Sequence, residues 1–381
     1  MAKSNKLVWI FGCLLTLALG AAYTNCGGPH AFEEQAQDGN GSGDPNDPGT
    51  PPPEFNSYIY VANHSGVRAF SLDANKQLVA ATVIGTPANS GFVLSVAADP
   101  LGQYVFTASI TPNTLLNSFS VNQTTGALTL ISSLQFTGRF PYSLRVDPSG
   151  NVVYAADNDN QSVWAFRINR ATGATTLIGE YNSQVSGSSY AEIGMHPSGS
   201  SLYVMGSNSI RNLAIGATGA LSLTQGYAFS GTHFAFSHDG RFIFGGNFAS
   251  NTIQPFAVAA DGALTAGANV NVGQGSLSRV QTDATGSYLF AAAGGTAIAA
   301  FEIGTTGALT FKSSVTVGGA NFFAITGDHT GTMVYATNRT GNDVIHQFQL
   351  DRATGALTKV GGTFNTGGNV YGMTFLKIKK N

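Results

Sequence analysis

The chain has 381 residues and a nearly balanced charge, with 18 Lys and Arg against 20 Asp and Glu. This length would ordinarily allow two or three domains, although a single all-β barrel or propeller can also use it. Only 10% of the residues are charged and 48 are glycine, which suits short strands and tight turns better than surface helices. We therefore expect an all-β protein, and the lack of a basic excess argues against nucleic acid as a partner.

Residues 1–25 have the pattern of a secretory signal peptide. Lys3 and Lys6 precede an apolar run, LVWIFGCLLTLALGAA, and a short polar segment then leads to Cys26. The stretch YTNCGG resembles the cleavage box of bacterial lipoproteins, which implies that Cys26 becomes the lipidated first residue of the mature protein. Two alternatives stay open: ordinary secretion after Ala21 or Ala22, and an uncleaved membrane anchor.

Residues 26–57 read as a tether between the lipid and a folded domain. The segment is rich in Gly, Pro, Asp and Asn and offers almost nothing to bury. Cleavage before Cys26 would remove two of the 18 basic residues, leaving 16 against 20 acidic ones and a net charge near −4. No cysteine follows Cys26, so the domain must hold its fold in an oxidising compartment without disulfides.

Beyond the tether the sequence repeats itself with a period of about 45 residues. A TGAL-type phrase alternates with a DPxG-type phrase, and each carries a glycine that we expect in a hairpin turn. A first TGAL-type copy without its glycine, Ala74 to Leu78, brings the number of copies to seven. The glycines of the first phrase are Gly126, Gly173, Gly219, Gly262, Gly307 and Gly355, and those of the second are Gly102, Gly150, Gly199, Gly240, Gly286 and Gly331.

Four short strands fit in each repeat, which predicts a single seven-bladed β-propeller over residues 58–381. The first copy begins at Tyr58 and has no innermost strand before it. After the seventh copy, the C-terminal segment has the pattern of an innermost strand, but no hairpin glycine follows it. We therefore predict that Tyr371 to Ile378 pairs with Tyr58 to Asn63, which closes the ring and removes two exposed edges.

The DPxG turns, the YVAN-type strands and the TGAL turns together resemble the lactonase-type seven-bladed propellers, which are related to the YVTN-repeat group. That family includes bacterial 6-phosphogluconolactonase and fungal carboxymuconate-cyclising enzymes, and the resemblance covers Tyr58 to Ile378. One phrase, GTHFAFSHDG, resembles a family motif that contains a histidine before a hairpin, and here the histidine is His233. Thr232 stands where the family motif has an arginine, so this position supplies no cation.

Equivalent positions of the repeats define rings around the propeller axis. Counting back seven residues from the DPxG glycines gives a ring in which Glu192, His233 and Arg279 stand on adjacent blades. Its other members are Ser95, Ser143 and Ala324, with Gly372 as the equivalent on the closing strand. Two residues deeper, Arg145 and Gln281 add polar groups. We expect Glu192, His233 and Arg279 to converge at the mouth of the central channel.

Three interpretations of this cluster stay open. It could open a lactone, with Glu192 or His233 as general base and Arg279 or Arg145 stabilising the oxyanion. It could bind an acidic or sugar-like ligand without turnover, with Arg145, Gln281 and Ser143 as further contacts. It could also be a set of solvated or mutually paired side chains in a wet channel.

Two classes of function follow: an exported, membrane-anchored binding scaffold of the bacterial envelope, or a lactonase-like hydrolase. The partners would be a small acidic or sugar-like ligand, or an envelope protein, with the membrane reached through the lipid. We expect no cofactor, no metal site and a monomer. The run Asp157 to Asn160 has the look of a calcium loop, but it lacks the glycine and distant glutamate that an EF-hand needs.

Overall fold

The computed structural model describes residues 54–85, 92–110, 113–137, 140–159, 161–185, 192–231, 233–273, 275–338 and 343–380. The predicted signal peptide, the predicted lipidation site Cys26, the predicted tether up to residue 53 and Thr232 lie outside these residues. In the part that is described, no helix is long and apolar enough to span a membrane.

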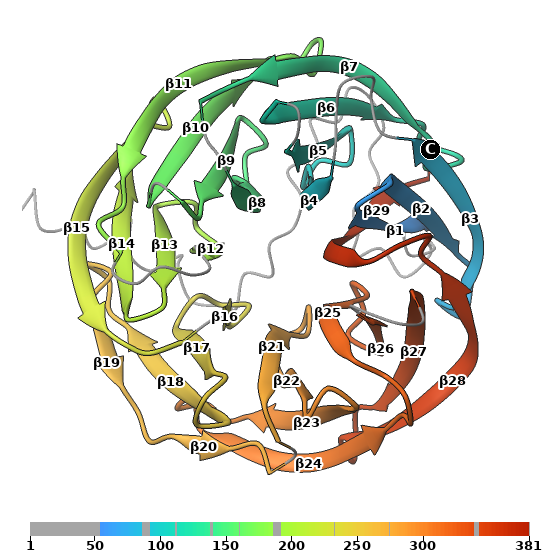
Figure 1. Cartoon of the computed structure of the whole chain (residues 1–381). Coiled ribbons are helices and arrows are strands. Elements are labelled where there is room, and N and C mark those ends of the chain that lie inside the picture. Colours follow the sequence, from blue (N-terminus) through green and yellow to red (C-terminus); the bar gives the residue numbers. More distant parts are fainter. Residues whose placement is uncertain are drawn as a thin grey trace, which may run out of the picture. The chain divides into compact units, whose positions relative to one another are not determined.

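Seven antiparallel sheets stand around a common axis, as the sequence predicted, and each forms one blade (Figure 1). From the axis outward, blade 1 contains β29 (Val370–Lys379), β1 (Phe55–Asn63), β2 (Gly66–Leu72) and β3 (Leu78–Gly85). Blade 2 contains β4 (Val93–Ala98), β5 (Tyr104–Ser109), β6 (Leu115–Val121) and β7 (Leu128–Gln135). Blade 3 contains β8 (Pro141–Val146), β9 (Val152–Asp157), β10 (Ser162–Ile168) and β11 (Thr175–Asn182).

The other four blades follow in chain order. Blade 4 contains β12 (Glu192–Met195), β13 (Ser201–Gly206), β14 (Ser209–Ile215) and β15 (Leu221–Ala228). Blade 5 contains β16 (His233–Phe236), β17 (Phe242–Asn247), β18 (Thr252–Val258), β19 (Leu264–Ala266) and the short β20 (Val270–Asn271), which also pairs with β18. Blade 6 contains β21 (Leu277–Thr282), β22 (Tyr288–Ala293), β23 (Ala297–Ile303) and β24 (Leu309–Thr316), and blade 7 contains β25 (Phe322–Gly327), β26 (Met333–Asn338), β27 (Val344–Asp351) and β28 (Ala356–Asn365).

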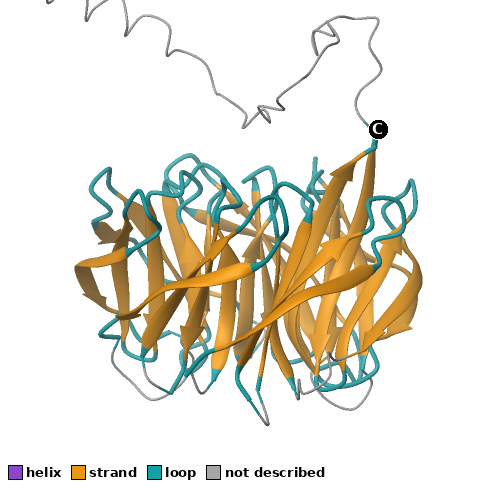
Figure 2. Ribbon diagram, turned by 90° about the horizontal axis from the view of Figure 1, so that it is seen from above, coloured by secondary structure: helices purple, strands orange, loops and turns teal. Residues whose placement is uncertain are grey.

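The C-terminal strand closes the ring, which confirms the predicted pairing. Strand β29 runs antiparallel to β1, with Tyr58 opposite Leu376 and Ala62 opposite Gly372. Figure 2 shows the ring from its side, with the strands running between its two faces. Strand β1 begins at Phe55, before the predicted start at Tyr58, because pairing with β29 continues to Lys379 and buries Ser57.

The predicted hairpin glycines all occupy the left-handed backbone region, with φ between +67° and +85°. The one TGAL-type copy without a glycine places Lys76 at that position, and Lys76 also has a positive φ, of 61°. An L-residue is strained there, because its Cβ approaches the backbone. The turn is therefore imposed by the repeat and not by the residue that fills it.

Buried tyrosines join neighbouring blades through these same turns. The hydroxyl of Tyr60 donates to the carbonyl of Gly126 at 2.9 Å, and that of Tyr154 donates to Gly219 at 3.0 Å. Tyr203 makes the equivalent bond to Gly262 at 2.9 Å. In the last blade Tyr335 donates to the carbonyl of Lys76, the residue that replaces the glycine. Each such bond satisfies a buried polar group and contributes on the order of 1 kcal/mol.

Candidate functional site

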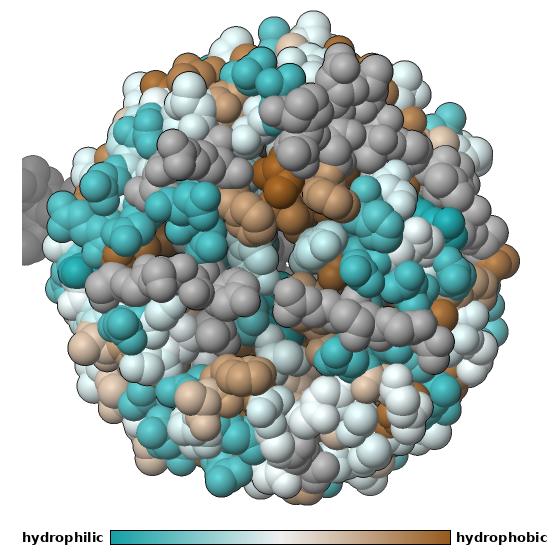
Figure 3. Space-filling model, viewed as in Figure 1, coloured by the Kyte–Doolittle hydropathy of each residue, from teal (hydrophilic) through white to brown (hydrophobic). Residues whose placement is uncertain are grey.

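A cavity of about 70 Å³ lies on the propeller axis, and all seven innermost strands contribute to its lining. Six of the seven residues in the predicted ring line it: Ser95, Ser143, Glu192, Arg279, Ala324 and Gly372. The seventh, His233, contacts Glu192 but is not among the residues that line the cavity. Figure 3 shows a narrow opening near the centre of the ring on the face seen in Figure 1.

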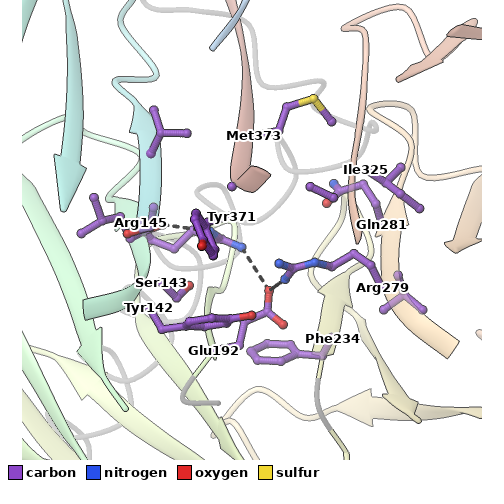
Figure 4. Close-up of a pocket in the computed structure, with 16 residues that line it drawn as sticks. Tyr142, Ser143, Arg145, Glu192, Phe234, Arg279, Gln281, Ile325, Tyr371 and Met373 are labelled. Atoms are coloured by element: carbon purple, nitrogen blue, oxygen red, sulfur yellow. Dashed lines mark hydrogen bonds and ion pairs between the residues drawn. The ribbon is translucent and has the colours of Figure 1, made fainter. Parts of the chain in front are cut away.

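Glu192, the first residue of β12, is the centre of the charged cluster. Its Oε1 accepts a hydrogen bond from Nη1 of Arg279 at 2.5 Å, and its Oε2 lies 2.9 Å from Nδ1 of His233. Arg145 approaches Oε1 from the opposite side, at 3.9 Å (Figure 4). The structure thus brings together the three residues that the ring predicted, from blades 4, 5 and 6, and adds Arg145 from blade 3.

These contacts keep the Glu192 carboxylate ionised. Burial by itself would raise the pKa of Glu192, but the positive charge of Arg279 and the contacts with His233 and Arg145 outweigh it and lower that pKa to about 2. The glutamate side chain is only 4% exposed. A carboxylate with so low a pKa is a weak base, so Glu192 is poorly suited to activate a water molecule.

His233 is held as a neutral imidazole. Burial lowers its pKa first, and the nearby charge of Arg279 lowers it further, whereas Glu192 opposes the shift. Because an ionised carboxylate can only accept, Nδ1 must carry the proton that is shared with Glu192. The other ring nitrogen, Nε2, is then an acceptor, which is the form that a general base requires.

The two arginines differ in how far their charge is already paired. Arg279 is 16% exposed and bonded to Glu192, and its guanidinium carbon lies 5.6 Å from the centre of the Phe323 ring. Arg145 is 41% exposed, and its separation from Glu192 exceeds hydrogen-bond length. Its Nη1 donates instead to the carbonyl of Leu144 at 2.8 Å. Arg145 therefore carries the less compensated charge.

Comparison with known proteins identifies the fold family. The family model for "Lactonase, 7-bladed beta-propeller" matches residues 57–188, 178–277 and 269–373, which together span most of the chain. The chain belongs to this lactonase family. A search of curated proteins finds no match in sequence to this lactonase-family propeller.

Solved structures of low sequence identity share the fold of this lactonase-family propeller. A protein from Lactobacillus plantarum is 18% identical, with a TM-score of 0.73, over 85% of this chain and 100% of its own. A candidate 6-phosphogluconolactonase from Bacteroides fragilis is 19% identical, with a TM-score of 0.71, over 84% and 98% of the two chains. The periplasmic gluconolactonase of Pseudomonas aeruginosa is 17% identical, with a TM-score of 0.70, over 85% and 99%. These similarities establish the architecture.

Ser143 and Gln281, two further residues predicted to contact a ligand, both line the cavity of this lactonase-family propeller. The hydroxyl oxygen of Ser143 accepts a hydrogen bond from the backbone N–H of Ile193 at 3.3 Å, which ties β8 to β12. The amide of Gln281 donates to the carbonyl of Thr282 at 3.2 Å. Ser143 is buried, and this hydrogen bond joins it to the neighbouring blade.

Aromatic residues complete the wall of the cavity, and counting ring positions alone missed them. Tyr142 and Tyr371 line it, together with Phe234. In β8 and β29 the pairing shifts by one residue, between Pro141 and Ser143 and between Val370 and Gly372. Such β-bulges redirect a side chain and are common beside functional sites. The signal available in the sequence was an aromatic residue next to a ring position, directly before it for Tyr142 and Tyr371 and directly after it for Phe234.

The calcium-like run serves a turn in the residues that are described. The carboxylate of Asp157 accepts hydrogen bonds from the backbone N–H groups of Asp159 at 2.9 Å and Phe140 at 3.3 Å. Within the described ranges, no three His, Cys, Asp or Glu side chains are placed to share a metal ion. Asn160, the last residue of the run, lies outside those ranges.

Proposed function

We propose that this lactonase-family propeller binds a small anionic, sugar-like ligand at the mouth of its central channel. The observation that carries the proposal is the cationic side chain of Arg145, which lines the axial cavity while the only acidic group described there, Glu192, is already bonded to Arg279. A positive charge in a partly desolvated site attracts an anion more strongly than the same charge does in bulk water.

The size of the cavity limits how such a ligand can enter. A volume of about 70 Å³ has room for a few water molecules, whereas pockets for drug-sized ligands occupy about 300 Å³ or more. The charged end of the ligand would therefore enter the cavity beside Arg145, and the rest would lie above it. Tyr142 and Tyr371 offer apolar ring faces on which the C–H groups of a sugar or sugar acid can pack.

The binding protein would act outside the cytoplasm. Support for export comes from the signal-like residues 1–25, and support for a lipid anchor comes from Cys26 before two glycines. The tether would then hold the propeller near the membrane as a scaffold of the bacterial envelope. The Pseudomonas aeruginosa structure with the same fold is named as a periplasmic protein, which is compatible with this location.

Lactone hydrolysis is the second candidate, and the hydrogen bond between His233 and Glu192 favours it. Nε2 of His233 would take a proton from water while the water oxygen bonds to the lactone carbonyl carbon. Arg279 or Arg145 would stabilise the resulting oxyanion, and Glu192 would stabilise the imidazolium. Collapse of the oxyanion would break the ring C–O bond, and the imidazolium would return its proton to the leaving oxygen. Binding ranks first because His233 does not line the described cavity.

Titration calorimetry with sodium gluconate, together with a proton-release assay on glucono-δ-lactone, tests both candidates. We expect gluconate to bind, and the neutral open-chain polyol sorbitol to bind much more weakly. If the site is catalytic, H233Q should lower turnover by roughly 10²–10⁴-fold, whereas the control H238Q, at an exposed turn residue, should not. Failure of gluconate and other small anions to bind would overturn the proposed binding function.

A further inference from the structure

We infer that the site selects monocarboxylates over phosphorylated ligands and that Arg145 is the residue that anchors the carboxylate. This inference rests on the proposed function and names its ligand class. The family resemblance would suggest a phosphorylated substrate, so this inference distinguishes carboxylate from phosphate ligands, which the fold by itself does not do.

The first step is the charge of the described cavity lining. Two arginines and one glutamate line it, and the charges of Arg279 and Glu192 cancel across a 2.5 Å contact. Both carboxylate oxygens of Glu192 are engaged, one by Arg279 and the other by His233. An incoming anion therefore meets a neutralised pair and one additional positive charge, that of Arg145.

The second step is the different accessibility of the two guanidinium groups. Arg279 packs against the Phe323 ring and its Nε points to the Phe323 carbonyl at 3.5 Å, so it is held between its neighbours. Arg145 is more exposed and reaches toward the centre of the cavity from blade 3 (Figure 4). Arg279 is thus a positioning residue for Glu192, and Arg145 is the group that a ligand can reach.

The third step compares the two anions. A carboxylate carries one negative charge, which one guanidinium can balance with two parallel hydrogen bonds. A phosphate monoester carries −1.5 to −2 at neutral pH. In this cavity its extra charge would face Glu192, and the described lining residues include no cation besides Arg145 and Arg279 to balance it. Desolvating an uncompensated charge is costly, so the phosphorylated ligand should bind more weakly.

Calorimetry at pH 7 on the full mature chain, with three matched probes, tests this inference. The probes are gluconate, sorbitol 6-phosphate and sorbitol, which are all open-chain six-carbon polyols and differ in charged group. We expect gluconate to bind at least about tenfold more tightly than sorbitol 6-phosphate, and R145Q to weaken gluconate by at least about tenfold. R145K, which keeps the charge without the planar fork, should lose less than R145Q.

Two controls isolate the site. R167Q removes an exposed arginine that donates to the carbonyl of Thr218 on the outer part of the propeller, and it should leave gluconate affinity within about twofold. R139Q/R339Q removes two arginines outside the described residues, and it should leave the ratio of the two affinities unchanged. The melting curve of each variant, followed by fluorescence of the buried Trp164, reports whether it folds.

The outcomes separate this inference from the function on which it rests. Sorbitol 6-phosphate binding as tightly as gluconate would overturn the selectivity and leave an anion-binding site in place. Unchanged gluconate affinity in folded R145Q and R145K would overturn the role of Arg145. A change in the ratio of the two anion affinities in R139Q/R339Q would show that arginines outside the described lining also set the selectivity. If neither anion binds, or if sorbitol binds as tightly as gluconate, the proposed function itself fails.

Discussion

Replacing Glu192 by Gln should destabilise the propeller markedly at neutral pH. The change is nearly isosteric, but it leaves the guanidinium of Arg279 without its ionic partner in a site where that partner is 4% exposed. Breaking a buried ion pair by removing one member typically costs about 3–5 kcal/mol. The depression of the Glu192 pKa from 4.5 to about 2 gives a consistent magnitude, roughly 3 kcal/mol at 1.36 kcal/mol per pKa unit.

The same reasoning fixes how the effect depends on pH. Because the pKa of Glu192 is lower in the folded state, its stabilising contribution is fully present above about pH 4.5 and is lost as pH falls toward 2. E192Q has no carboxyl group to titrate, so the difference in unfolding free energy between the two proteins should be largest near pH 7. It should narrow progressively below about pH 4.5.

Denaturant unfolding followed by Trp164 fluorescence measures this difference between pH 3 and pH 7. In thermal melts 3 kcal/mol corresponds to a shift on the order of 4 °C for a domain of this size. E180Q is the matched control, because Glu180 is exposed and bonded only to the Ser162 hydroxyl in the described part, and it should change stability by no more than about 0.5 kcal/mol. The double variant E192Q/R279Q should recover part of the loss, since the guanidinium that was bonded directly to Glu192 is then no longer left without its carboxylate. A loss below about 1 kcal/mol at pH 7, or one that does not vary with pH, would refute the reasoning.

Three other predictions concern closure, turns and anchoring. Truncation after Gly368 should abolish cooperative unfolding, because it removes the strand that pairs with β1. Truncation after Lys379 is the control and should have little effect. A cooperative melt of the chain that ends at Gly368 would contradict closure of the ring by β29. K76G should stabilise the domain by up to about 1 kcal/mol by relieving a positive φ. G126A should destabilise it, because the new Cβ would lie 2.3 Å from the Tyr58 ring; the opposite order of midpoints would show that turn strain is unimportant. C26S should release the protein from the membrane fraction without shifting its melting temperature, and unchanged retention would instead indicate an uncleaved anchor.

The sequence by itself determined the architecture. Glycines at a regular spacing specified turns that only a left-handed backbone can make, and seven copies of a four-stranded unit can bury their apolar faces only by stacking into a ring. The unmatched strands at the two ends predicted their own pairing, since each would otherwise leave an open edge. Repetition also aligned Glu192, His233 and Arg279 at equivalent positions, so their proximity followed from the register.

Only the tertiary structure decided which of these side chains form hydrogen bonds and ion pairs with one another. Equivalent positions in a repeat fix where each Cα lies, but not which rotamer a long side chain adopts or which charge is already neutralised. The contacts assign Arg279 and His233 to Glu192 and leave Arg145, from the deeper ring, as the accessible cation. The β-bulges that bring Tyr142 and Tyr371 to the cavity break the period of two on which strand patterns depend, so the rings of the sequence could not contain them.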